Sequence, residues 1–544
     1  MERLEDLQKE IIEVLCEEDP VMATFMGIHE YDDKLPFYDN ENILEIKNLK
    51  EDHIRELQKI DKMNLTLEQQ DDLEILLSYL KSDLYIKETI KEIYRKPSIY
   101  PEVALYGVYI LLLRETVPFK QRMKSMVERL NTIPKMLDQG IKNLQIGTNI
   151  PKIWVEIALE MTQNGLLFLE QIVPQLAGLT PILFKQLLKA NTLAINAFKN
   201  YADFLIEELL IKSNGNFAIG EEVYNQILKQ KYLLPYKAKD LLNFAVKSSI
   251  ETEKLLVETA KKINPNKSWK EIIDESKNDY PNPKNLIEFY QRSLDIAKKF
   301  IIEKDLFTVP DGDKLSVVET PIFERSTVPY SAYISPAPFE EKQQAFFWIT
   351  PVNFHLPISK QKEQLQGHNF HTATLITIHS GYPGHHLQCI IANKSKSTIR
   401  KFLYDNVFSE GWALYCEELL YEQGFYKDPI TRLFQLKDQL WREYRVIIDV
   451  QFQVGNMTPE EAVKLLIDKV KLEPVNALAE VKNYIQDPTG PMAYSVGKRE
   501  ILKLREHLKN SQGKKFNLKK FHDNLLNQGA IPFSILEKRL ELLR

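Results

Sequence analysis

Apolar residues recur at spacings of three and four through most of residues 1–303. Segments such as LEDLQKEIIEVL at 4–15 and LIEFYQRSLDIAKKFI at 286–301 place these residues on one face of a helix. Glycine is scarce, at 19 of 544 residues, about half of the usual share of roughly 7%. The pattern therefore predicts a mainly α protein.

The periodicity changes between residues 313 and 352, where β-branched and aromatic runs alternate with proline-containing turns. We expect three short strands there, and helices again from about residue 364. Helix starts are also marked locally, because Thr66 with Gln69 and Thr458 with Glu461 have the spacing of a capping box. The predicted organisation is an N-terminal helical region, 1–310, and a C-terminal region, 311–544, which together form one unit with a cleft.

Charge and apolar content exclude several classes of protein. The chain has 71 Lys and Arg against 76 Asp and Glu, so it lacks the basic excess of a protein that binds nucleic acid or an anionic membrane. The longest apolar stretch, VALYGVYILLL at 103–113, is far shorter than the roughly 20 residues of a membrane-spanning helix. The charged opening residues do not resemble a secretory signal, and three cysteines suit a reducing compartment, so we expect a cytoplasmic location.

Three of the ten histidines lie in the stretch HSGYPGHHLQ at 379–388. In a straight helix, His379 and His385 would be about 9 Å apart along the axis and rotated by about 120°, so they could not share a metal ion. Pro383 must break or bulge such a helix, and a bulge that absorbs two residues would bring the two histidines one turn apart. The alternative is that the histidines bond backbone carbonyls freed by the proline.

A second motif, FSEGWALYCEELLYEQGFY, begins at residue 408. Zinc hydrolases with two histidines on one helix commonly take a glutamate from a following helix as the third protein ligand, and Glu410 has that position. Glu417 lies two turns further along the same helix face and could accept a hydrogen bond from a ligand histidine. For an isolated glutamate, a solvated position on the helix surface is the competing interpretation.

The two motifs resemble domain-of-unknown-function family 885, whose pattern is HExxPGHHxQ followed by EGWALYxE. The resemblance extends through LKDQLWREYRVIIDV, MTPEEAVKLL and PMAYSVGKREILKLRE, up to residue 506. Motif order makes this family similar to the helical gluzincin peptidases, which include angiotensin-converting enzyme and thermostable carboxypeptidases. The resemblance implies an elongated, zincin-like helical fold with a deep cleft, one zinc ion, and a peptide or small amide as substrate.

The resemblance also assigns roles to individual residues. It implies that the zinc ligands are His379, His385 and Glu410. It implies that Tyr494 hydrogen-bonds the oxyanion as it forms. His386, Arg442 and Arg445 are expected to contact substrate, and Asp449 with the two arginines could equally buttress the site through ion pairs.

This chain departs from the family pattern at the position of the general base. Ser380 replaces the expected glutamate, and Gln453 stands where a histidine is expected. Losing the carboxylate should cost a factor of roughly 10² to 10⁴ in rate. Glu417 or Glu418 could replace the base, the protein could be a metal-holding pseudoenzyme, or the serine could be an introduced change. Ser380 acting as a nucleophile is a weaker option, since no nucleophile elbow surrounds it.

The sequence thus predicts a zinc-dependent metallopeptidase or amide hydrolase, with a catalytically impaired or peptide-binding protein as the alternative. An edge of the small sheet could pair with an extended substrate.

Overall fold

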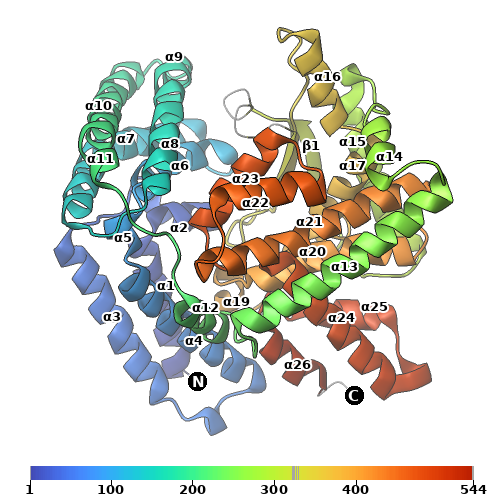
Figure 1. Cartoon of the computed structure of the whole chain (residues 1–544). Coiled ribbons are helices and arrows are strands. Elements are labelled where there is room, and N and C mark those ends of the chain that lie inside the picture. The colour runs from blue at the N-terminus through green and yellow to red at the C-terminus, as the bar shows by residue number, and fades with distance from the viewer. Residues whose placement is uncertain (1, 322–324, 326–327, 329, 542–544) are drawn as a thin grey trace. The chain divides into compact units, whose positions relative to one another are not determined.

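The computed structural model describes residues 2–321, 325, 328 and 330–541. The chain forms two compact units, one made of residues 1–218 with 337–342 and the other of residues 219–336 with 343–544 (Figure 1). Residues 219–303, which the sequence analysis groups with the N-terminal helices, lie in the second unit. The predicted mainly helical class is confirmed.

The first unit is built of helices. Its longest helix, α7, packs against α6 and α10. The buried apolar stripe of α7 includes Met126, Leu130 and Leu137. The capping box predicted at Thr66 and Gln69 starts α4. The helices are α1 (Glu2–Glu18), α2 (Pro20–Met26), α3 (Asn40–Gln58), α4 (Leu67–Ile90), α5 (Glu92–Arg95), α6 (Ile99–Leu113), α7 (Phe119–Ile146), α8 (Lys152–Gln171), α9 (Val173–Gly178), α10 (Phe184–Phe204) and α11 (Leu210–Lys212).

The second unit contains the small sheet and both sequence motifs. Its helices before and around the sheet are α12 (Glu221–Gln230), α13 (Ala238–Ile263), α14 (Trp269–Ser276), α15 (Leu286–Glu303), α16 (Ile358–Gly367) and α17 (Phe370–Ile376). The helices that follow are α18 (His385–Ala392), α19 (Thr398–Phe402), α20 (Asn406–Glu422), α21 (Pro429–Gln453), α22 (Pro459–Leu465), α23 (Pro474–Gln486), α24 (Ala493–Gln512), α25 (Leu518–Asn527) and α26 (Phe533–Glu541). The capping box predicted at Thr458 and Glu461 starts α22.

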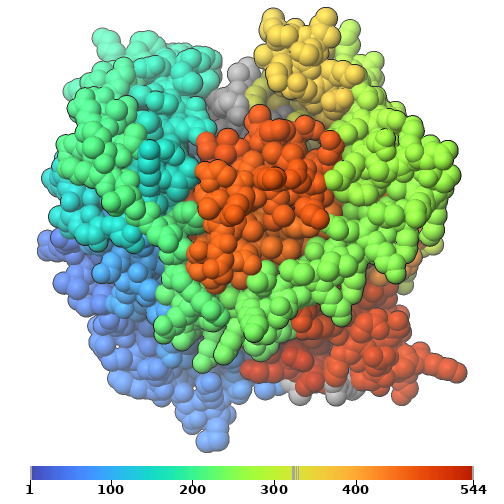
Figure 2. Space-filling model, viewed as in Figure 1, coloured from blue at the N-terminus to red at the C-terminus, as the bar shows by residue number. Residues whose placement is uncertain are grey.

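Two long helix pairs dominate this unit, because α13 packs along α21 and α20 packs along α24. The closest approach of α20 to α24 is at Gly411 and Gly497, where a Cβ added to Gly497 would lie 1.8 Å from the carbonyl oxygen of Val407. Only glycine permits that backbone contact. Figure 2 shows α23, in orange, at the surface of the unit, where its Val475 is 80% exposed.

The three predicted strands are present as β1 (Leu315–Glu319), β2 (Ser331–Ile334) and β3 (Ala345–Ile349). Their order in the sheet is β1-β3-β2, with β1 parallel and β2 antiparallel to the central β3. The central strand, AFFWI, is the most buried of the three. One edge strand, β1, contacts α15, and the other, β2, contacts the turn that carries His379.

No helix in the described part of the chain is long and apolar enough to span a bilayer. The cytoplasmic location stays a prediction.

Candidate metal centre

The helix that enters the histidine motif breaks as its proline predicts. After α17 the chain widens into a π-helical turn, η6 (Thr377–Gly381), passes through a cis Tyr382–Pro383 peptide, and resumes as α18 at His385. The N–H of Gly384 donates to the carbonyl oxygen of Ile378 at 3.0 Å. A Cβ on Gly384 would lie 1.9 Å from the carbonyl oxygen of His379, so this position requires glycine.

The break brings together the three predicted ligands. One ligand atom from each of His379, His385 and Glu410 lies within 4.8 Å of the others. The Nε2 atoms of His385 and His379 lie 3.4 and 3.8 Å from Oε2 of Glu410. The two imidazoles meet nearly at right angles, at 85°. The predicted convergence of these side chains is therefore confirmed, and the group can hold one metal ion.

Contacts from α20 fix the turn relative to Glu410. The indole Nε1 of Trp412 donates to the carbonyl oxygen of Pro383 at 3.0 Å, and Cys416 Sγ lies 3.5 Å from the same oxygen. Both side chains are fully buried. Cys416 is a free cysteine, and burial raises the pKa of its thiol.

Glu417 lies behind His379, as predicted for an acceptor that orients a ligand. Its Oε1 lies 2.8 Å from Nδ1 of His379, and its side chain is only 4% exposed. Because a carboxylate only accepts, Nδ1 carries the proton and the lone pair of Nε2 is left for a metal.

The charge state of Glu410 suits an anionic ligand. Burial raises the pKa of its carboxyl, but the neighbouring His385, His379 and Arg445 outweigh burial and lower the pKa to about 2. Its Oε2 is buried and has no hydrogen-bond partner among the described residues. Such an orphaned acceptor beside two imidazoles matches the donor set of a catalytic zinc site.

Tyr494 is half-buried beside the predicted ligands. Its ring stacks on that of His379, with centroids 6.3 Å apart and planes at 16°. Burial raises the pKa of its phenol, and the negative charge of Glu410 adds to the rise, so the hydroxyl keeps its proton and can donate a hydrogen bond.

The two arginines of α21 differ in what they contact. Arg445 donates from Nη2 to Glu480 at 2.7 Å and from Nε to the hydroxyl of Tyr484 at 2.9 Å, so the protein itself uses its donors. The guanidinium of Arg442 lies 4.3 Å from the ring centroid of Trp441 and 5.5 Å from that of Tyr494. Its Nε and Nη1 are buried, and no described residue accepts from them.

His386 differs from its predicted role as a substrate contact. Its side chain is fully buried, with Nε2 bonded to Asp313 at 2.6 Å and Nδ1 to the hydroxyl of Tyr333 at 3.1 Å. Both ring nitrogens are therefore committed to the fold. Tyr333 also stacks on the ring of His385, with planes at 8° and centroids 6.5 Å apart, and nothing in its sequence context marks it as a neighbour of the site.

Asp449 and Gln453 have structural partners. Asp449 is fully buried and accepts from the Tyr224 hydroxyl at 2.8 Å and from the N–H of Thr489 at 3.1 Å. Burial raises its pKa to about 8. Gln453 is also fully buried and accepts from the N–H of Ile219 at 3.3 Å. These contacts join α21 to α12 and to the segments that precede α12 and α24.

Ser380 stands where the resemblance implies a general-base glutamate. It is half-buried in η6, directly after His379. Glu418, one of the two acids proposed as substitutes, pairs with Arg432 at 2.9 Å and Lys498 at 3.2 Å. Burial raises the pKa of Glu418, but Lys498 and Arg432 outweigh burial and lower it to about 2.

Solved structures with the same fold include the following two. One is a candidate lipoprotein of unknown function from Shewanella oneidensis, with a TM-score of 0.83 and 21% identity over 99% of this chain and 100% of the other. The second, a candidate lipoprotein from Colwellia psychrerythraea, has a TM-score of 0.84 and 18% identity over 99% of both chains. At these identities the likeness shows the fold alone.

Sequence comparison gives the family. No curated protein matches the chain at a significant level. The profile of the family described as bacterial protein of unknown function, DUF885, matches residues 20–540. The chain therefore belongs to the DUF885 family.

Proposed function

We propose that this protein is a zinc-dependent hydrolase of peptides or small amides, with His379, His385 and Glu410 as zinc ligands. The observation that carries the proposal is the orphaned Oε2 of Glu410, which lies within 3.8 Å of the Nε2 atoms of both histidines. Two imidazole nitrogens and one carboxylate oxygen are a common catalytic zinc set, which leaves a fourth position open.

A bound zinc ion supplies Lewis acidity toward a substrate carbonyl and toward water. The chain's own residues account for the other requirements of such a reaction. Glu417 holds His379 in one tautomer, and Tyr494 can donate a hydrogen bond to the carbonyl oxygen as that oxygen gains negative charge.

Arg442 is the residue best suited to bind a substrate carboxylate. Its planar donors match a carboxylate in geometry, and unlike Arg445 it has donors that no described residue uses. Its guanidinium also faces the ring of Tyr494, which itself stacks on His379. These contacts support a substrate with a free carboxylate near the metal. Arg445, whose guanidinium lies 4.7 Å from the ring centroid of Tyr494, serves to position that ring.

The second candidate function is a metal-holding protein that binds peptides without cleaving them. Ser380 favours it, because a hydroxyl is a poor base at neutral pH. The contacts of the two acids that could replace the base also favour a protein without hydrolase activity. Glu417 is bonded to His379, and Glu418 is paired with Arg432 and Lys498.

Zinc content tests the proposed site. We expect the untagged protein to purify with about one zinc ion per chain and the Glu410→Ala variant to have none, measured by plasma mass spectrometry. Glu422→Gln is the matched control, because Glu422 lies on the same helix and pairs with Arg505 at 2.7 Å. Negligible zinc in the unaltered chain, or equal zinc in it and Glu410→Ala, would remove the proposal.

Hydrolysis separates the two candidates. A mixed peptide library is incubated with the unaltered chain, Ser380→Glu and Ser380→Ala, each with and without a zinc chelator. Chelator-sensitive cleavage by the unaltered chain supports the enzyme. Cleavage that appears only in Ser380→Glu supports the metal-holding binding protein.

A further inference from the structure

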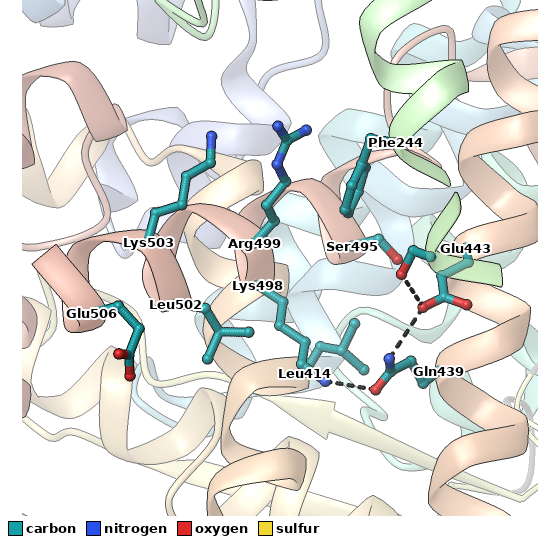
Figure 3. A pocket seen from close by; sticks show the side chains of 11 residues that line it. Phe244, Leu414, Gln439, Glu443, Ser495, Lys498, Arg499, Leu502, Lys503 and Glu506 are labelled. Atoms are coloured by element: carbon teal, nitrogen blue, oxygen red, sulfur yellow. Dashed lines mark hydrogen bonds between the residues drawn. The ribbon is translucent and has the colours of Figure 1, made fainter. Parts of the chain in front are cut away.

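Helices α13, α20, α21 and α24 line a cavity of about 450 Å³, open to solvent, in the second unit (Figure 3). This volume falls within the range of about 300–1,000 Å³ that is usual for small-molecule sites. None of the three proposed zinc ligands lines it. The cavity therefore needs an explanation of its own.

One part of its lining is a buried acid with an unused oxygen. Glu443 is 1% exposed, and its Oε1 accepts from Ser248 at 2.6 Å, Thr252 at 2.9 Å and Gln439 at 3.1 Å. Its Oε2 is buried and unbonded within the part of the chain that the structure describes. Burial raises the pKa of this carboxyl, and a cation placed beside it would stabilise the charged carboxylate and lower the pKa again.

A hydroxyl on α24 adds to this acid. Ser495 is 6% exposed, and its buried Oγ also has no partner within the described ranges. Figure 3 shows Ser495 beside Glu443. The nearby Lys498 does not satisfy either group, because its Nζ bonds to Gln439 at 2.7 Å and to Glu418 at 3.2 Å. Buried polar atoms are seldom left unbonded, so these two point to a ligand.

The opposite charge comes from Arg499. Its guanidinium lies 4.4 Å from the ring centroid of Phe244 and 4.8 Å from that of Tyr236. Its nearest acid is Glu500, at 3.9 Å from Nε, and its Nη1 is buried without an acceptor among the residues described. Figure 3 shows Arg499 and Lys503 extending from α24 on the same side. Lys503 is paired with Glu500 at 3.0 Å, so Arg499 is the cation with an unused donor.

Apolar side chains complete the lining. Phe244 from α13, Leu414 from α20 and Leu502 from α24 contribute to the walls. The cavity thus combines an acid on α21, a hydroxyl and a guanidinium on α24, and apolar surface.

We propose that this cavity binds a free α-amino acid with an apolar side chain. The ammonium group pairs with Glu443 and Ser495, the carboxylate accepts from Arg499, and the side chain packs on Leu414 and Leu502. A zwitterion is the small ligand class that satisfies both charges at once. The proposal does not rest on the metal centre or on any hydrolase activity.

Calorimetric titration of the full chain with L-leucine tests the proposal. We expect one leucine to bind per chain, and binding to weaken about 10- to 100-fold when a charged hydrogen-bonded partner is lost. Two altered ligands each remove one charged group without any change to the protein. Leucine amide lacks the carboxylate, and N-acetyl-leucine lacks the ammonium group.

Variants assign the binding to this cavity. Arg499→Gln and Glu443→Gln should weaken leucine binding by the same factor, whereas Lys509→Gln should not, since Lys509 is an exposed cation on the same helix outside the lining. Glu410→Ala should bind leucine normally even if it has lost zinc. If either cavity variant fails to fold, as judged by thermal unfolding, the two altered ligands still decide.

Three results would overturn the proposal. The first is absence of binding for leucine, methionine and phenylalanine at millimolar concentration. The second is equal binding of leucine and leucine amide. The third is loss of leucine binding in Glu410→Ala with retention in Arg499→Gln, which would place the ligand at the metal centre.

Discussion

Glu417→Gln isolates the effect of the residue that orients His379. The carboxylate lies 2.8 Å from Nδ1 and is only 4% exposed, so solvent screens the bond little. Loss of a carboxylate partner behind a ligand histidine costs about 10- to 100-fold in metal affinity. Glutamine keeps an acceptor oxygen but loses the charge, so we expect about a 10-fold loss. Glu417→Ala removes the acceptor as well, and we expect about a 100-fold loss, or about 2.7 kcal/mol.

Competition with a chromophoric zinc chelator measures these affinities directly. Glu418→Gln is the control. Glu418 follows Glu417 on α20 and is also largely buried, but it pairs with Arg432 and Lys498. It should lower the free energy of unfolding and leave zinc affinity unchanged. Equal zinc affinity in the unaltered chain and Glu417→Ala would refute the assigned role of Glu417. An equal loss in Glu418→Gln would show that the effect is a general one on the fold.

Three further predictions follow from other contacts. Gly384→Ala should lower the free energy of unfolding by about 1–3 kcal/mol or more and reduce zinc content, because its Cβ would lie 1.9 Å from a carbonyl oxygen; an unchanged denaturation midpoint would contradict this. The pKa of His29 is raised from 6.5 to about 8, chiefly by its hydrogen bond to Asp32 and against the effect of burial. The contribution of protonated His29 to the free energy of unfolding is therefore full below pH 6.5 and is lost as the pH rises through about 8. The difference in free energy of unfolding between the unaltered chain and His29→Asn should shrink over that interval. A difference that does not change with pH would show that the pairing is absent. In a Ser380→Glu background that cleaves peptides, Tyr494→Phe should lower kcat by about 10²- to 10³-fold with unchanged zinc content, and an unchanged kcat would exclude Tyr494 as the oxyanion donor.

Local sequence patterns predicted the helices, the three strands and the meeting of His379, His385 and Glu410. Periodicity and capping act within a few residues, so they can be recognised without knowing the tertiary fold. The break at Pro383 is also a local effect, since proline lacks the N–H that a straight helix would need there.

Roles that depend on distant partners were not predictable in this way. His386 is removed from solvent by Asp313, which lies 73 residues earlier, and Arg445 is occupied by Glu480, which lies 35 residues later. Before these partners are known, His386 resembles a third reactive histidine and Arg445 cannot be told from Arg442. The difference between the two arginines is a difference in what surrounds them, not in their spacing along α21.

Ser380 makes the proposed metal binding and the proposed catalysis separately testable. The grouping of His379, His385 and Glu410 depends on the π-helical turn, on Gly384 and on the contacts of α20 with Pro383, and Ser380 is not one of the three grouped residues. Under the proposed function, a change at residue 380 alters the position of the general base and leaves the three proposed ligands in place. Zinc affinity should then be the same in the unaltered chain, Ser380→Ala and Ser380→Glu, while hydrolysis differs among them. A large difference in zinc affinity among these three proteins would mean that residue 380 takes part in holding the metal. Metal binding and hydrolysis would then not be independent at this position.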